Sequence, residues 1–219
     1  MQQTSQVECK FFPINGTHSF VQYEARISTA QHNYLTGSAD DSGKKSNKGR
    51  VLIQCLDRSG SMHGKPFEAL KAGAMQMGEA CIGDEPPFER FITIFFDNGR
   101  PEVKETQNKE EYLQYMRNQN TRGAEDFVKC FKWINDNVLE NNNGKVEDLT
   151  IIFLTDGVDT SNSHQQIRQY FEPFKLKLAQ LKSRILTLGL GAHHDAPIMN
   201  YIAQGGSDQG NFLYIDTQQ

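Results

Sequence analysis

Nearly continuous apolar runs alternate along this chain with segments whose apolar residues recur every three or four positions. The runs lie at residues 51–56, 90–96, 149–154 and 184–189. Runs of this length, bounded by Gly, Asp and Asn, are typical of strands buried on both faces of a parallel sheet. We therefore expect four core strands, with shorter strands at residues 102–104 and 212–215.

The segments between these runs have the spacing of amphipathic helices. The clearest one carries Phe67, Leu70, Ala74 and Cys81 at helical intervals, and Pro66 lies where a first helical turn favours proline. Further helices are expected at residues 109–118, 127–138, 165–182 (with Pro173 as a kink or restart) and 195–203. Strands that alternate with helices predict an α/β fold, a doubly wound, mainly parallel, Rossmann-like sheet with helices on both faces.

The N-terminal region has a different pattern. Two strands are expected at residues 7–12 and 20–27, because Asn15-Gly16 between them is a strong hairpin turn signal. The sequence therefore predicts an N-terminal β-hairpin extension at residues 1–36, a flexible Gly- and Ser-rich linker at 37–49 and the main domain at 50–219.

Composition and charge limit the kinds of partner and compartment that we expect for this protein. Basic residues number 23 and acidic ones 27, for a net charge of −4, and no long basic run appears. This balance argues against nucleic acid or a membrane surface as a partner. The absence of a secretory signal, of a membrane-length apolar stretch and of any CxxC pair among the four cysteines predicts a cytoplasmic protein with reduced core thiols.

Oxygen-bearing side chains follow two of the expected core strands. Asp57, Ser59 and Ser61 alternate after the first, and Thr155-Asp156-Gly157 ends the third. The carboxyl ends of parallel strands lie at one edge of a sheet, so these groups meet if the strands are neighbours. Carboxylates and hydroxyls without Cys or His predict a site for a hard divalent cation, Mg²⁺ or else Mn²⁺ or Ca²⁺.

The motif Asp57-Arg58-Ser59-Gly60-Ser61-Met62, followed along the chain by Thr155-Asp156-Gly157, resembles the von Willebrand factor type A (vWA) family over roughly residues 50–216. The resemblance implies a six-stranded sheet with one antiparallel edge strand. It also implies a metal-ion-dependent adhesion site (MIDAS) in which Asp57, Ser59 and Ser61 contact the ion, with Asp156 bound directly or through water.

The second loop of this site departs from the family, which usually has Gly-Gly-Thr just before a helix. Here Gly123-Ala124-Glu125 precedes the expected helix, so Glu125 occupies the threonine position, with Thr121 as the alternative. Three carboxylates around a divalent ion leave a formal charge of about −1. Such a site holds a cation well and attracts an acidic ligand less. The other interpretation is that Glu125 caps its helix and faces water.

Three more residues are expected to line a ligand-binding rim around the metal, namely His63, Asp97 and His194. Residues 191–195 resemble a Gly-x-His-Asp loop of some intracellular vWA proteins. Adjacent side chains diverge, so the pair His193-His194 favours loop hydrogen bonding over zinc binding. Asp195 is expected to be a helix N-cap, and turn chemistry is the simplest role for Asp97.

These features favour a monomeric, non-enzymatic binding module whose metal coordinates an Asp or Glu of a protein partner. The first alternative is a metal-dependent phosphoryl-transfer enzyme with an aspartate nucleophile. That chemistry needs a second carboxylate where this chain has Ser59. The second is the substrate-recruiting domain of a larger ubiquitin-ligase-like protein, because the hairpin before the domain resembles such proteins.

Overall fold

The computed structural model describes residues 12–14, 18–20, 47–140, 145–191 and 194–215. The chain divides into two compact units, Met1–Asn47 with Gln219, and Lys48–Gln218, and each is considered by itself. In the first unit, β1 (Phe12–Ile14) pairs with β2 (His18–Phe20) in antiparallel register. The predicted hairpin is present, but β1 and β2 overlap the predicted strands only at Phe12 and Phe20, because Pro13, Ile14, His18 and Ser19, expected between the strands, belong to them. The rest of the predicted strands and residues 37–46 of the predicted linker fall outside the described residues.

A six-stranded sheet forms the centre of the second unit, in the order β5-β4-β3-β6-β7-β8. All neighbouring strands are parallel except β5, which runs antiparallel to β4 at one edge. The strands are β3 (Arg50–Asp57), β4 (Arg90–Phe96), β5 (Glu102–Glu105), β6 (Asp148–Thr155), β7 (Lys182–Leu190) and β8 (Asn211–Ile215). This topology confirms the predicted fold class, including the antiparallel edge strand.

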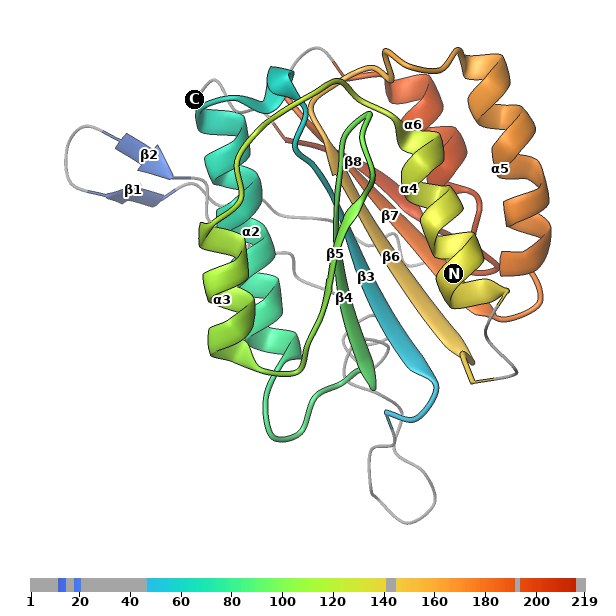
Figure 1. Ribbon diagram of the computed structural model, residues 1–219, viewed down its shortest axis with the longest axis horizontal. Coiled ribbons are helices and arrows are strands. Elements are labelled where there is room, and N and C mark those ends of the chain that lie inside the picture. Colours follow the sequence, from blue (N-terminus) through green and yellow to red (C-terminus); the bar gives the residue numbers. More distant parts are fainter. Residues whose placement is uncertain (1–11, 15–17, 21–46, 141–144, 192–193, 216–219) are drawn as a thin grey trace, which may run out of the picture. The chain divides into compact units, whose positions relative to one another are not determined.

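Helices cover both faces of this sheet (Figure 1), with α2 and α3 on one face and α4, α5 and α6 on the other. They are α2 (Lys65–Cys81), α3 (Lys109–Arg117), α4 (Phe127–Ile134), α5 (His164–Leu178) and α6 (Ala196–Ala203). A 3₁₀ turn at Gly60–Met62 precedes α2, and a π turn at Asn135–Leu139 extends α4. Among the described residues, no helix has the length and apolar character needed to cross a bilayer.

Proline does not interrupt α5, which is continuous through Pro173 where the sequence suggested a kink or restart. Pro173 and Gln169, whose carbonyl loses its helical donor, are both exposed, so water can satisfy that carbonyl. Phe171 and Phe174 hold the helix against the core on either side of the proline. The helix ends at Leu178, before the predicted residue 182, because β7 already begins at Lys182.

Aromatic packing fixes the start of α4 against the sheet. The ring of Phe153 on β6 stacks on Phe96 of β4 at 5.0 Å and on Phe131 of α4 at 5.1 Å, and Phe127 meets it edge-on at 5.0 Å. All four rings are buried. Since α4 begins at Phe127, this packing also positions the loop just before it, which carries Glu125.

Candidate metal centre

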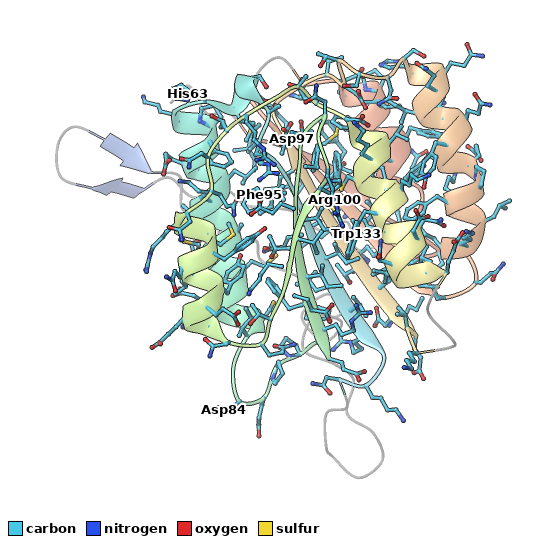
Figure 2. All side chains as sticks on the ribbon, viewed as in Figure 1. His63, Asp84, Phe95, Asp97, Arg100 and Trp133 are labelled. Atoms are coloured by element: carbon cyan, nitrogen blue, oxygen red, sulfur yellow. The ribbon has the colours of Figure 1, made fainter. Side chains whose placement is uncertain are left out.

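The carboxyl ends of β3 and β6 lie side by side, because these strands are parallel neighbours with Leu56 opposite Leu154. Asp57 is the last residue of β3, and Asp156 directly follows β6. In Figure 2, Asp97 and His63 lie toward this same edge of the sheet, whereas Asp84 lies at the opposite edge. The sheet topology therefore gathers the loops that the sequence suggested would meet.

Asp57 is fully buried, and both of its carboxylate oxygens accept hydrogen bonds. The Ser59 backbone N–H donates to Oδ1 at 2.7 Å, and the Thr155 hydroxyl donates to Oδ2 at 2.5 Å. Thr155 Oγ1 in turn accepts from the Gly157 N–H at 3.1 Å. These bonds fix the orientation of the carboxylate and join the end of β3 to the loop after β6.

A cluster of oxygens surrounds Ser59 and Ser61, whose hydroxyls lie 2.9 Å apart. Both hydroxyls donate to Glu125 Oε1, at 3.1 Å from Ser59 and 2.7 Å from Ser61. The Ser61 hydroxyl also lies 2.9 Å from Asp156 Oδ1. The five residues that the sequence proposed as metal ligands are thus brought together from three loops.

Glu125 faces this cluster and not the solvent. Its side chain is buried, and its second oxygen accepts from the Thr160 hydroxyl at 3.0 Å. Asp126 caps α4 by accepting from the Lys129 N–H at 3.0 Å, so the alternative in which Glu125 caps the helix is wrong. Thr121, the alternative to Glu125, instead lies 3.4 Å from His63 Nδ1.

The negative charge of the cluster has no cationic partner within the described residues. Asp57, Glu125 and Asp156 each place a carboxylate oxygen within 4.8 Å of the others, and none of the three forms an ion pair with Lys, Arg or His there. Burial raises the pKa of Asp57 to about 7. Burial, with the charge of Glu125, also raises the pKa of Asp156. Ionisation of Asp57 and Asp156 is therefore costly unless a cation joins them.

The donor set fits a divalent cation. It consists of carboxylate and hydroxyl oxygens, the ligands that hard cations prefer. The absence of a side chain at Gly157 leaves room for this arrangement, because a Cβ there would lie 2.6 Å from Glu125 Oε1. Asp57, Ser59, Ser61, Glu125 and Asp156 are the residues that would hold the ion.

The three residues expected at the ligand rim differ in their surroundings. His63 is exposed beside Thr121. Asp97 is only 2% exposed, and its carboxylate is held by Arg58 and Arg122. His194 stacks on Tyr214 with ring centroids 4.8 Å apart, and its Nδ1 lies 2.7 Å from the Gly191 carbonyl oxygen. Asp195 caps α6 as expected.

Sequence reasoning named Thr155 in the Thr155-Asp156-Gly157 motif without giving it a contact, and it missed the Thr160 hydroxyl and the Arg58 guanidinium. Thr155 orients Asp57, and Thr160 orients Glu125. Arg58 is a buried cation that lies in the sequence between the proposed ligands Asp57 and Ser59. The contact of Thr155 could have been predicted, since this residue ends the apolar run directly before Asp156. The contact of Thr160 could not, because it depends on the conformation of the loop after β6.

Sequence comparison does not by itself assign the chain to a family. No family model matches the chain. An uncharacterized protein of Synechocystis sp. is 27% identical over 200 residues, which cover 89% of this chain and 42% of that protein. The chain thus spans less than half the length of this curated relative.

Solved structures with similar folds are vWA domains. The von Willebrand factor type A protein from Catenulispora acidiphila has a TM-score of 0.63 at 15% identity, over 76% of this chain and 38% of that one. The SpRpn10 VWA domain has a TM-score of 0.60 at 15% identity, over 77% and 89%. Proximal thread matrix protein 1 of the mussel byssus, solved with zinc in its MIDAS motif, has a TM-score of 0.58 at 13% identity, over 80% and 44%.

These likenesses define the class of fold. Residues 48–215 have the fold of a von Willebrand factor type A domain, as the sequence motifs suggested. The carboxyl ends of its strands carry an acidic cluster that resembles a MIDAS and whose oxygens suit a divalent metal ion.

Proposed function

We propose that this domain is a metal-ion-dependent protein-binding module. The observation that carries the proposal is the cluster of three carboxylates and two serine hydroxyls, in which Asp57 and Glu125 are buried and Asp156 is half-buried, without a compensating cation among the described residues. A bound divalent cation supplies positive charge that attracts an Asp or Glu carboxylate of a partner. Mg²⁺ is the cation we expect, with Mn²⁺ and Ca²⁺ as alternatives of the same ligand preference.

Each residue of the cluster has a separate role in the proposed cation binding. Asp57, Glu125 and Asp156 supply charge, while Ser59 and Ser61 supply neutral oxygens. Thr155 and Thr160 hold two of the carboxylates in place. Because Glu125 brings a third negative charge, we propose that the site binds its cation tightly and an acidic partner more weakly than a site with two carboxylates.

We propose no catalytic role for the cluster. Asp57 would be the nucleophile of a phosphoryl-transfer enzyme, and both of its oxygens already accept hydrogen bonds, from Ser59 and Thr155. The position of the general acid is Ser59, a poor proton donor at neutral pH. Phosphatase activity that Asp57→Asn abolishes would contradict this assignment.

Calorimetric titration of the full chain with MgCl₂, MnCl₂ and CaCl₂ tests the metal site. We expect saturable binding of at least one ion, lost in Asp57→Ala and retained in Asp84→Ala. Asp84 is the matched control, since it is exposed at the opposite edge of the sheet (Figure 2). Equal heats for the wild type and Asp57→Ala would refute the metal site.

Binding of a carboxylate is tested separately with acetyl-aspartate-amide as the probe. NMR shifts at Ser61 and Gly157 are expected with the metal present, and none after removal of the metal with EDTA. If the ion binds and these shifts remain absent, the metal site stands and its role in partner binding fails.

A further inference from the structure

A second polar site lies directly beside the proposed metal loop, and it centres on Arg58. This side chain is 2% exposed, although it carries a full charge. Its Nε donates to Asp97 Oδ2 at 2.9 Å, and its Nη1 donates to Glu102 Oε2 at 2.7 Å. Its Nη2 is buried and has no hydrogen-bond acceptor among the residues that the structure describes. A buried charged donor without an acceptor is costly, so it marks a place where an acceptor is missing.

A second guanidinium lies against the same carboxylate. Arg122 Nε donates to Asp97 Oδ2 at 2.8 Å, and this side chain is 60% exposed. The terminal nitrogens of Arg122 form no hydrogen bond within the described part of the chain. The Arg122 backbone N–H also donates to the Arg58 carbonyl at 2.6 Å, which holds the two arginines together.

A cavity of about 310 Å³ adjoins both arginines, and we call it the Arg58 cavity. It is lined by Arg58, Glu102, Tyr115 and residues 118–122. Arg58 lies between Asp57 and Ser59 in sequence, and the Gly60 N–H donates to the Gly123 carbonyl at 3.0 Å, joining the metal loop to the end of this lining segment. The segment that lines the cavity is therefore joined directly to the proposed metal loop.

Charge and hydrogen bonding indicate what the Arg58 cavity accepts. Two arginines and the two carboxylates that hold them, Asp97 and Glu102, sum to a formal charge of zero. A carboxylate in the cavity would leave an uncompensated charge beside Glu102, whereas a neutral oxygen would leave the balance intact. Asn118 and Asn120 add carboxamide donors and acceptors, which match an amide group. The Gln119 carboxamide already accepts from Arg58 Nη1 at 3.2 Å and donates to Glu102 Oε1 at 2.9 Å.

We propose that the Arg58 cavity binds a neutral amide group of a polypeptide, either a backbone peptide or an Asn or Gln side chain. The amide oxygen accepts from the guanidinium groups, and the amide N–H donates to the carboxamides of the lining. Its role as a second recognition point beside the metal rests on the proposed function, whereas amide binding itself needs no metal.

Two isosteric probes test the cavity, acetyl-asparagine-amide and acetyl-aspartate-amide, which differ in charge at one group. Each is titrated into the ¹⁵N-labelled full chain in EDTA, where the metal site is inactive. We expect the asparagine probe to give saturable shifts at the Nε–H groups of Arg58 and Arg122, the Gln119 side chain and the amides of residues 118–122. The aspartate probe should not shift these signals in a saturable way.

A blocking variant separates the cavity from general surface binding. Asn120→Trp fills the cavity from an exposed loop position, so it leaves the buried arginine network intact, and we expect it to abolish the shifts. Asn137→Trp, at another exposed asparagine, should keep them. Unchanged shifts in Asn120→Trp, or tighter binding of the aspartate probe, would overturn the proposal. Loss of the Mg²⁺-dependent aspartate response alone would instead refute the proposed function and leave the amide site standing.

Discussion

Two clusters of charged side chains lie side by side at the carboxyl ends of the strands, and they differ in whether positive charge balances the carboxylates. In one, Asp57, Glu125 and Asp156 lie within 4.8 Å of one another without a cationic partner among the described residues. In the other, Arg58 lies against Asp97 and Glu102 at hydrogen-bond distance. Adjacent residues of one loop, Asp57 and Arg58, thus belong to clusters of opposite character.

The pKa values of Asp57 and Asp97, one from each cluster, are shifted in opposite directions. Burial raises the pKa of Asp57 to about 7, because no positive charge offsets it. Burial also acts on Asp97, but hydrogen bonds from Arg122 and Gly99 and the charge of Arg58 outweigh it and lower the pKa. A hydrogen bond from Arg58 likewise lowers the pKa of Glu102. The arginine cluster supplies its own counter-ions, whereas the metal-type cluster lacks one and is suited to take a cation from outside.

Removing the internal counter-ion should have the largest effect. Arg58→Met leaves Asp97, 2% exposed, without its buried partner, so we expect a loss of about 3–5 kcal/mol in the free energy of unfolding. Urea denaturation followed by circular dichroism measures it. Arg122→Met removes a 60% exposed partner of the same carboxylate and should cost about 1 kcal/mol or less. Similar losses for the two variants would contradict the assigned role of Arg58.

Lowering the pH should change the contributions of the two clusters to the free energy of unfolding in opposite directions. Without metal, the folded pKa of Asp57 is raised from 3.8 to about 7, so folded protein binds more protons than unfolded protein in that interval. Its contribution therefore stabilises the fold below about pH 4 and is lost as the pH rises toward 7, by up to ~4 kcal/mol. Asp97 and Glu102, with lowered pKa values, contribute in the opposite direction and lose their contribution at acid pH.

Denaturation of the wild type and Asp57→Asn in EDTA from pH 4 to 7 measures the Asp57 contribution. The difference in unfolding free energy between the two proteins should change in favour of Asp57→Asn as the pH rises. A difference that is constant with pH would show that burial does not hold the proton on Asp57.

The two clusters also differ in what the sequence could reveal about them. The metal-type cluster was predictable in outline, because Asp57, Ser59, Ser61 and Asp156 directly follow apolar runs whose parallel pairing brings their ends together. Glu125 was found by counting back from the start of α4. The ligand roles of these five residues remain a prediction, since their proximity does not by itself establish metal binding.

The arginine cluster was not visible in the same way. Arg58 reaches Asp97 after β4, Glu102 on β5 and Gln119 after α3, three partners that no local pattern connects. Asp97 was assigned to the ligand rim because it ends a strand at the correct edge of the sheet. Its 2% exposure depends on side chains from two other loops, which periodicity and spacing do not place.

Adding the missing cation should stabilise the first cluster and leave the second unchanged. At a free Mg²⁺ concentration of 100 times Kd, we expect the free energy of unfolding to rise by about 2.7 kcal/mol. Thermal unfolding of the full chain with MgCl₂ or EDTA at pH 7.5 measures the shift. Asp57→Ala should lose it, and Asp84→Ala should keep it. Stabilisation of Asp57→Ala to the wild-type extent would locate the ion elsewhere.

The smallest expected effect concerns the third carboxylate of the metal-type cluster. Glu125→Thr lowers the number of carboxylates from three to two, so the affinity for Mg²⁺ should fall while the bound ion keeps more positive charge for a ligand. At saturating Mg²⁺, we expect acetyl-aspartate-amide to bind roughly fivefold tighter, a gain of about 1 kcal/mol, because one repulsive charge a few ångströms away has been removed.

Glu125→Gln, which removes the charge and keeps the size, is the matched variant and should change both affinities in the same directions as Glu125→Thr. Calorimetry of the metal and of the probe yields the two affinities separately. If both fall together in both variants, Glu125 acts only as a structural acceptor for Ser59, Ser61 and Thr160.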